Sequence, residues 1–328
     1  MYEWHRQIQT IITQIDESII RRDDEELTLR GLARRLGYSE TYVTRQFQAI
    51  TGLRFRTYMT ARRLAFALRE VRDTDRRLLD IALDYGFSSH EAFTRAFRRE
   101  YGMSPAAYRR RLTAVVLRTR IAAFDRYAFG MEEIGIMKSQ GSISVYFTTI
   151  PAHSFLYIRN GESNGYWSFW QHHEGIPGQD CHTVCGLIDS IPGKLDDMGT
   201  GDISSGAGHV MAYESSPDGG RFDCYPVPRF ECYGCRLSAD YAGPVPEQML
   251  LRRVPEGEYI VFEHGPFDYD QENRSVEFAI DEAFDSFDWS ATDYEFDDTD
   301  GRMYYFYHDP ERCWKEMWPV RRKADCAN

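Results

Sequence analysis

Two arginines occupy matching positions in a repeated stretch of this sequence. Arg45 follows Thr44, and Arg95 follows Thr94 one repeat, or 50 residues, later. A guanidinium group carries a planar fork of donors that fits the acceptors on the major-groove edge of guanine, and it also pairs with phosphate. These residues predict nucleic-acid recognition at two places on one chain.

The repeat extends well beyond the arginines. Segments 32–52 and 81–102 share residues at fixed positions, 49 apart before the turn and 50 apart after it. An apolar helix ended by Gly37 and followed by a helix capped by Ser39 is the pattern of a helix-turn-helix motif. Two such motifs can place recognition helices in successive major grooves, about 34 Å apart.

The polar residues off the buried face of each recognition helix are the candidates for DNA contact. In the first helix they are Thr41, Tyr42, Thr44, Arg45 and Gln48, and in the second they are Ser89, His90, Glu91, Thr94, Arg95 and Arg98. We expect at least one of Arg45 and Arg95 to contact a base; the alternative is that both contact only phosphate or water.

Residues 25–112 resemble the DNA-binding domain of the AraC/XylS family. The similarity is strongest over 80–111, which includes Tyr-Gly-Phe-Ser-Ser and Tyr-Gly-Met-Ser-Pro. The resemblance implies an all-α domain with two helix-turn-helix motifs, double-stranded DNA as its partner, and a role in transcription regulation.

Charge divides the chain into two halves. The 328 residues carry a net charge of −12, but residues 1–118 hold 22 Arg, no Lys and 15 Asp and Glu, a balance of +7. Residues 119–328 hold 17 basic and 36 acidic residues, a balance of −19. A basic half can neutralise phosphates, whereas an acidic half is repelled by them. We predict a DNA-binding domain over 1–118, a linker over 119–142 and a second domain over 143–328.

Apolar periodicity predicts the elements of both halves. Outside the motifs, helices are expected at 4–21, 56–72 and 105–117. In the second half, strands are expected at 144–150, 154–159, 183–190, 209–214, 221–227, 257–263, 302–308 and 316–320, with helices at 166–173 and 272–287. This order predicts an α+β domain built from two strand-helix-strand-strand repeats.

Residues 143–328 resemble the GyrI-like effector-binding domain. The resemblance is carried by Gly-Glu-Tyr-Ile-Val-Phe-Glu-His-Gly-Pro at 257–266 and by the aromatic cluster at 303–311. It implies a groove for a small molecule, and an aromatic lining with a few acids suits flat, lipophilic, often cationic ligands. Many relatives have a Glu in the strand equivalent to 304–307, where this chain has an aromatic residue. The candidate effector-binding residues are Tyr157, Trp167, Trp170, Tyr259, Glu263, Tyr305, Tyr307 and Trp314.

The seven cysteines favour free thiols in a reducing compartment. Spacing leaves open whether Cys181, Cys185, Cys232 and Cys235 bind zinc, but unligated thiols are favoured and no cofactor or metal is expected. The sequence holds no catalytic triad, nucleophile elbow or phosphate-binding loop, so no enzyme is expected. It also holds no apolar run of about 18 residues that could span a membrane.

The sequence therefore predicts a cytoplasmic transcription regulator that binds double-stranded DNA, senses a small aromatic or lipophilic effector and contacts RNA polymerase. Two alternatives remain for the acidic half: a protein-interaction module or a small-molecule hydrolase.

Overall fold

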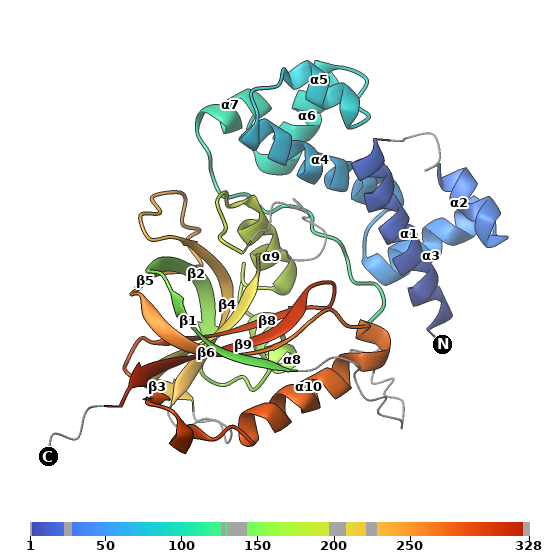
Figure 1. The fold of residues 1–328 in the computed structure, drawn as a ribbon. Helices are drawn as coiled ribbons and strands as arrows, with labels where there is room; N and C mark the ends of the chain where they lie inside the picture. Colours follow the sequence, from blue (N-terminus) through green and yellow to red (C-terminus); the bar gives the residue numbers. More distant parts are fainter. Residues whose placement is uncertain are drawn as a thin grey trace, which may run out of the picture. The chain divides into compact units, whose positions relative to one another are not determined.

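The computed structural model describes residues 2–22, 28–125, 129, 143–196, 208–220 and 228–323. The chain forms two units (Figure 1). The helical unit contains the described residues up to 129 together with the later segment His182–Pro192. The sheet unit contains the remaining described residues from 143 to 323.

The helical unit holds eight described helices. They are α1 (Glu3–Arg21), α2 (Leu29–Leu36), α3 (Glu40–Thr51), α4 (Phe55–Asp73), α5 (Leu78–Asp84), α6 (His90–Tyr101), α7 (Pro105–Arg110) and, from the later segment, α9 (Cys181–Ser190). The helices expected over 4–21 and 56–72 are confirmed as α1 and α4. The helix expected over 105–117 is wrong beyond Arg110, where the chain becomes extended.

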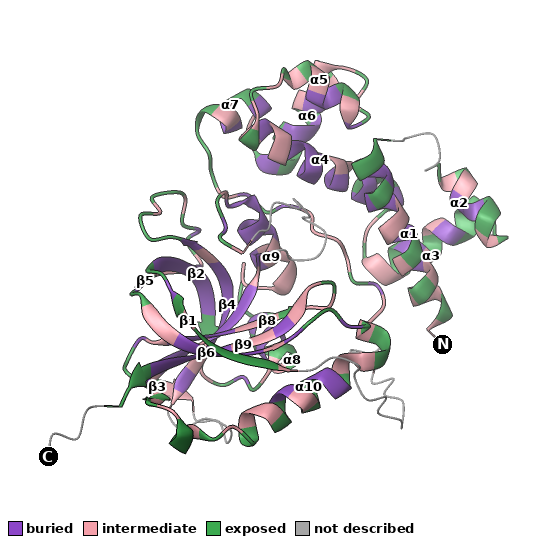
Figure 2. Ribbon diagram, in the orientation of Figure 1, coloured by how far each residue is buried: buried purple, intermediate pink, exposed green. Residues whose placement is uncertain are grey.

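Helix α4 is the centre of this unit. Figure 2 shows it buried along most of its length, and it contacts α1, α3, α5, α6 and α7. Five isoleucines of α1 that recur at helical spacing are at most 4% exposed and pack in the same core: Ile8, Ile11, Ile12, Ile15 and Ile19. Arg62 of α4 is fully buried and forms a bidentate pair with Asp16 of α1, with both N–O distances 2.8 Å.

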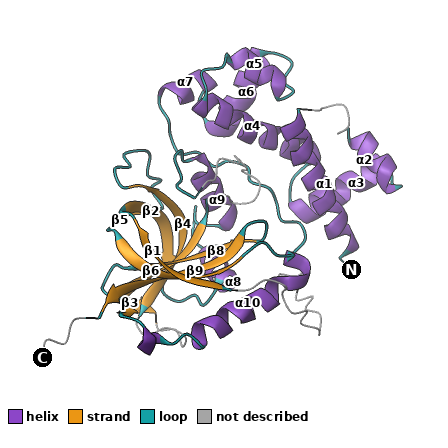
Figure 3. Ribbon diagram, viewed as in Figure 1, coloured by secondary structure: helices purple, strands orange, loops and turns teal. Residues whose placement is uncertain are grey.

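The sheet unit is a curled antiparallel sheet with helices (Figure 3). Its strands are β1 (Ser144–Ile150), β2 (His153–Asn160), β3 (Val210–Gly220), β4 (Arg229–Ser238), β5 (Leu250–Val254), β6 (Gly257–His264), β7 (Tyr294–Phe296), β8 (Met303–Asp309) and β9 (Cys313–Arg322). Their order is β1-β6-β9-β8-β3-β4-β2-β5, with β7 paired to β9. Helices α8 (Tyr166–His173) and α10 (Tyr269–Asp285) and a short turn of 3₁₀ helix (Trp289–Ala291) complete the unit.

Most of the expected elements of this half are present. Strands expected at 144–150, 154–159, 209–214, 257–263, 302–308 and 316–320 correspond to β1, β2, β3, β6, β8 and β9, and both expected helices are present as α8 and α10. The strand expected at 183–190 is wrong, because this segment is α9. The strand expected at 221–227 lies outside the described residues, and β4, β5 and β7 were not expected.

Alternation along the strands gives the sheet two faces. Face A buries Phe155, Tyr157, Tyr259 and Tyr305 in one core. On face B, residues such as Ile260, Phe262 and Tyr304 form a second core with apolar residues of α10, and Trp170 of α8 packs on Tyr233 of β4. Helix α10 runs along the sheet in Figure 1. None of the helices in the described ranges has the length and apolar character of a membrane span.

Candidate DNA interface and candidate ligand site

The two recognition helices, α3 and α6, begin in the same way. The side chain of Ser39 accepts a hydrogen bond from the amide of Tyr42 at 3.3 Å, and that of Ser89 accepts one from the amide of Ala92 at 3.1 Å. Each serine satisfies one of the amide groups that a helix start leaves without an intrahelical partner. The two sequence copies therefore produce the same local structure.

The turns before these helices also match. The amide of Tyr38 donates to the carbonyl of Ala33 at 3.0 Å, and the amide of Phe87 donates to that of Ala82 at 2.9 Å. Each bond closes a left-handed C-cap, which in the first motif needs a φ of 73° at Gly37. A side chain is strained in that conformation, so glycine is favoured there.

The eleven predicted DNA-contact residues lie on the outer sides of the two motifs. Seven are exposed: Thr41, Tyr42, Arg45, Gln48, Glu91, Arg95 and Arg98. Four are half-buried: Thr44, Ser89, His90 and Thr94. Of these four, Ser89 caps α6 and the hydroxyl of Thr44 donates to the carbonyl of Glu40 at 2.8 Å, so both also have structural roles.

The acidic member of the set stays charged. The pKa of Glu91 is lowered by a hydrogen bond from its own amide, then by the Ser89 side chain and by the positive charges of His90 and Arg95. A carboxylate at the start of a helix also interacts favourably with the helix dipole. Glu91 can therefore accept a hydrogen bond but repels phosphate.

Helix α4 joins the two motifs. Its 19 residues span about 28 Å at a rise of about 1.5 Å per residue, and it contacts both α3 and α6. Successive major grooves on one side of a duplex are about 34 Å apart. A single buried helix of this length is a suitable spacer for two recognition helices.

In the sheet unit, strand alternation divides the eight predicted effector residues. Five belong to face A: Tyr157, Tyr259, Glu263, Tyr305 and Tyr307. Trp314 belongs to face B, and Trp167 and Trp170 lie on α8. The structure thus brings them together in groups and not around one centre.

The face A tyrosines are deeply placed. Tyr157, Tyr259 and Tyr305 are at most 2% exposed, and burial raises the pKa of Tyr157 and of Tyr259 to about 12. The hydroxyl of Tyr305 lies 2.5 Å from Nε2 of His153. Their role as ligand contacts stays a prediction.

Face A also buries a carboxylate that sequence reasoning missed. Glu214 of β3 is 1% exposed, accepts a hydrogen bond from the Tyr157 hydroxyl at 3.1 Å, and pairs with Arg159 at 3.1 Å and with Arg252. Two arginines balance its charge, so this cluster fixes β2, β3 and β5 to one another.

The other predicted residues differ in their exposure. Glu263 accepts a hydrogen bond from the Tyr146 hydroxyl at 2.6 Å and pairs with Lys315 at 3.2 Å. Trp167 is 51% exposed, whereas Trp170 is 6% exposed with its ring centroid 4.8 Å from that of Tyr233. Trp314 packs on Phe306 at 5.3 Å.

A continuous aromatic strip runs across face B. We define the face B strip as Tyr213 of β3, Tyr304 and Phe306 of β8, and Glu316 and Trp318 of β9. The ring centroids of Tyr213 and Tyr304 are 5.3 Å apart, and those of Tyr304 and Trp318 are 4.5 Å apart. The indole nitrogen of Trp318 donates to the carboxylate of Glu316 at 3.2 Å.

Two carboxyl groups of face B hold their protons more readily than usual. Burial raises the pKa of Glu316, although the hydrogen bonds from neighbouring aromatic side chains oppose the rise. Burial likewise raises the pKa of Glu231 of β4, whose carboxylate accepts hydrogen bonds from the Gly165 amide at 3.1 Å and the Tyr213 hydroxyl at 3.2 Å. A cationic ligand beside either group would favour its ionised form.

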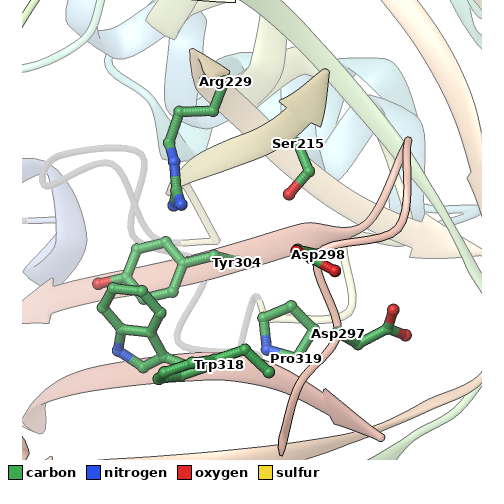
Figure 4. A pocket seen from close by; sticks show the side chains of 8 residues that line it. Ser215, Arg229, Asp297, Asp298, Tyr304, Trp318 and Pro319 are labelled. Atoms are coloured by element: carbon green, nitrogen blue, oxygen red, sulfur yellow. The ribbon is translucent and has the colours of Figure 1, made fainter. Parts of the chain in front are cut away.

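A small pocket opens at one end of the strip (Figure 4). Its lining combines a cation, aromatic rings and acids: Ser215, Arg229, Phe296, Asp297, Asp298, Tyr304, Trp318 and Pro319. In Figure 4 the guanidinium of Arg229 points toward the ring of Tyr304. Asp297 is 5% exposed and is held by Thr299 and Arg302, each at 2.5 Å.

The four cysteines singled out by their spacing lie on two different elements. Cys232 and Cys235 are buried on β4, and a separation of three residues along a strand places them on opposite faces of the sheet. Cys181 and Cys185 lie on α9. Across the described ranges, no group of three or more potential metal-ligating side chains occurs.

Comparison with known proteins finds relatives of the helical unit. A family model described as a helix-turn-helix domain matches residues 32–111. The regulatory protein SoxS of Salmonella typhimurium is 42% identical over 109 residues, which are 33% of this chain and 98% of SoxS. The right origin-binding protein of Escherichia coli is 42% identical over 87 residues, covering 26% of this chain and 30% of that protein.

Among solved structures, the DNA-binding domain of the transcriptional factor AdpA in complex with a target DNA is 28% identical. The match covers 31% of this chain and 89% of that one, with a TM-score of 0.29. Because the match to SoxS spans almost all of that regulator at 42% identity, the chain belongs to the AraC/XylS family of DNA-binding transcription regulators.

Proposed function

We propose that the helical unit binds one asymmetric site on double-stranded DNA, with both recognition helices in successive major grooves. The observation that carries this is the repetition of one motif, with equivalent caps and turns, on either side of α4. Exposed arginines at matching positions, Arg45 and Arg95, support contacts to bases in both grooves. The domain boundaries we propose are 1–118 for DNA binding and 143–328 for the second domain.

The test uses duplexes selected from a random pool by the full-length protein. Arg45→Ala and Arg95→Ala should each weaken binding to the selected duplex by about 1–3 kcal/mol, or roughly 5- to 150-fold. Arg312→Ala, in the sheet unit, is the matched control and should leave affinity unchanged. If both recognition-helix variants bind like the wild type, the proposed two-groove contact is refuted.

We further propose that the sheet unit is a GyrI-like effector domain made of two strand-helix-strand-strand repeats. Support comes from the pairing order, in which β2-β4-β3 and β6-β9-β8 are arranged alike and meet at β3 and β8. In each set a helix of the sheet unit, α8 or α10, follows the first strand; α9, which also follows β2, belongs to the helical unit. A ligand site between two such repeats would lie on the face that both helices cover.

The face B strip is the site we propose for the effector. It presents the rings of Tyr213, Tyr304 and Trp318 beside the carboxyl of Glu316. Burying a flat apolar molecule against such rings is favourable, and a positive charge on the molecule adds cation–π and carboxylate contacts. The supported ligand class is therefore a small aromatic molecule, neutral or cationic.

A thermal-shift screen with planar aromatic amines and their uncharged analogues tests this site. A ligand that binds only the folded state stabilises it, by about 2.7 kcal/mol when its concentration is 100 times its Kd. This stabilisation raises Tm. Trp318→Ala should abolish the shift, whereas Phe278→Ala, on the exposed side of α10 at 49% exposure, should not. Absence of any shift across the panel would refute the site and favour a protein-interaction module.

A further inference from the structure

Helix α9 follows α8 along the chain, yet it is built into the helical unit. The extended segment after α7 contacts it: the amide of Leu117 donates to the carbonyl of Gly186 at 3.1 Å, and the amide of Val115 donates to the hydroxyl of Ser190 at 3.1 Å. Val115, Leu117 and Ser190 are all buried. Backbone donors in the core need partners, and α9 supplies two of them.

A second contact ties α9 to α4. Arg72, in the last turn of α4, donates from its guanidinium to the carbonyl of Ser190 at 3.0 Å. This carbonyl is at the carboxyl end of α9, where helix carbonyls are left without intrahelical partners and a positive charge is favourable. Because α4 contacts both α3 and α6, a single helix connects α9 to each recognition helix.

The packing of α9 leaves no room for a side chain at Gly186. A Cβ atom there would lie 2.4 Å from the carbonyl oxygen and 2.9 Å from the amide nitrogen of Leu117. Both are backbone atoms, so they cannot move aside without shifting the extended segment. Glycine is thus required by the close approach of two chain segments.

Five and six residues beyond the end of α9, the chain is anchored in the sheet unit. The amide of Leu195 donates to the carbonyl of Arg236 at 2.9 Å, and Arg236 forms a bidentate pair with Asp196 at 2.9 and 2.6 Å. Arg236 lies on β4, the strand that also carries Glu231 of face B. One strand therefore bears both this anchor and a residue next to the proposed ligand site.

Helix α9 lies outside residues 32–111, the segment that the helix-turn-helix family model matches. It is therefore an addition to that segment, and it packs against the helical unit from about 70 residues further along the chain.

We propose that α9 couples the sheet unit to DNA binding. A change at the Asp196–Arg236 anchor is carried through residues 191–195 to α9, and from α9 to Arg72 and the 115–117 segment. This inference rests on the proposed function, since it supplies the route by which the effector domain would act on the recognition helices. Coupling of this kind requires that the two sites bias one shared structural element.

A double-mutant cycle on the full-length protein tests the route without an effector. Asp196→Asn removes the charge of the anchor while keeping its shape, and Gly186→Ala displaces α9. We expect Asp196→Asn to change the Kd for the selected duplex about fivefold or more in the wild type. In the Gly186→Ala background the same change should have less than about a twofold effect.

Two further variants, a matched control and a substitute for Gly186→Ala, complete the test. Gly265→Ala is the matched control, because no atom lies within 4 Å of its added Cβ, and it should leave the Asp196→Asn effect intact. If Gly186→Ala does not fold, Ser190→Ala serves in its place, since it removes the acceptor for the Val115 amide. Equal Asp196→Asn effects in both backgrounds, or no effect in the wild type, would overturn the proposal.

Hydrogen exchange separates failure of the route from failure of DNA binding. Asp196→Asn should speed exchange of the Val115 and Leu117 amides even with no DNA present. If these amides are unaffected, the coupling is refuted whatever the DNA result. If they respond but no duplex is discriminated, the proposed DNA function fails and the route stands.

Discussion

The buried ion pair between α1 and α4 offers a quantitative test of what holds the helical unit together. Arg62 is 0% exposed at its side chain and Asp16 is 5% exposed, with two N–O contacts of 2.8 Å. Removing one member leaves a buried charge uncompensated, which costs about 3–5 kcal/mol. Asp16→Leu should therefore destabilise the helical unit by that amount.

The double variant Asp16→Leu/Arg62→Met separates charge from packing. It leaves no buried charge, and its main loss is the hydrogen bond from Arg62 to the carbonyl of Arg118, 2.5 Å long in the wild type. An unsatisfied buried carbonyl costs about 1–3 kcal/mol. The double variant should thus be more stable than Asp16→Leu alone.

Hydrogen exchange of the α4 amides is the suitable assay, because it reports opening of this unit separately from the sheet unit. A loss of 3–5 kcal/mol corresponds to about two to nearly four powers of ten in exchange rate. Arg77→Ala, which breaks an exposed pair with Asp80 (Arg77 side chain 81% exposed), should leave the exchange rates of the α4 amides nearly unchanged. The reasoning is refuted if Asp16→Leu behaves like this control, or if the double variant is the least stable of the three.

Three further outcomes are expected. Because burial raises the folded-state pKa of Glu316 above its ordinary value, stability from this group is complete at low pH and is lost as pH rises through that pKa; Glu316→Gln should raise Tm at pH 8, and an equal gain at pH 4 would contradict this cause. Ser39→Ala and Ser89→Ala should each cost about 1 kcal/mol through the lost helix caps, seen as faster exchange at the starts of α3 and α6; unchanged exchange would show that the caps do not stabilise these helices. Binding to the selected duplex should weaken steeply with salt, by a log–log slope of about −0.9 per phosphate neutralised, and a flat response would exclude a phosphate-dominated interface.

The helical half could be predicted closely because its signals are local. Ser39, Gly37 and their counterparts in the second motif specify caps and turns within a few residues, so their spacing alone places the helices. The end of α7 could not be placed, since the chain after Arg110 is fixed by contacts with α9, a segment about 70 residues away.

The error at α9 has a recognisable cause. Val184, Leu187, Ile188 and Ile191 are all buried, and their spacing of three, four and seven residues is that of a helix. We expected a strand because the second half as a whole shows the alternation that is typical of strands. Within this segment, the helical spacing of the apolar residues was the better guide.

The ligand-site residues were harder to assign. Tyr305 and Tyr307 alternate with Tyr304 and Phe306, and the sequence does not reveal which set faces the covering helices. That choice is settled by long-range pairing, such as Tyr213 opposite Tyr304, and no short motif encodes it.

The meeting of β3 with β8 has a mechanical consequence. In the pairing order of the described strands, this ladder joins the two three-stranded sets, and Tyr213 faces Tyr304 across it. A molecule stacked on both rings would bridge the two three-stranded sets and resist any shear of one set past the other. Occupancy would then stiffen the whole sheet and sharpen its melting into a single cooperative step.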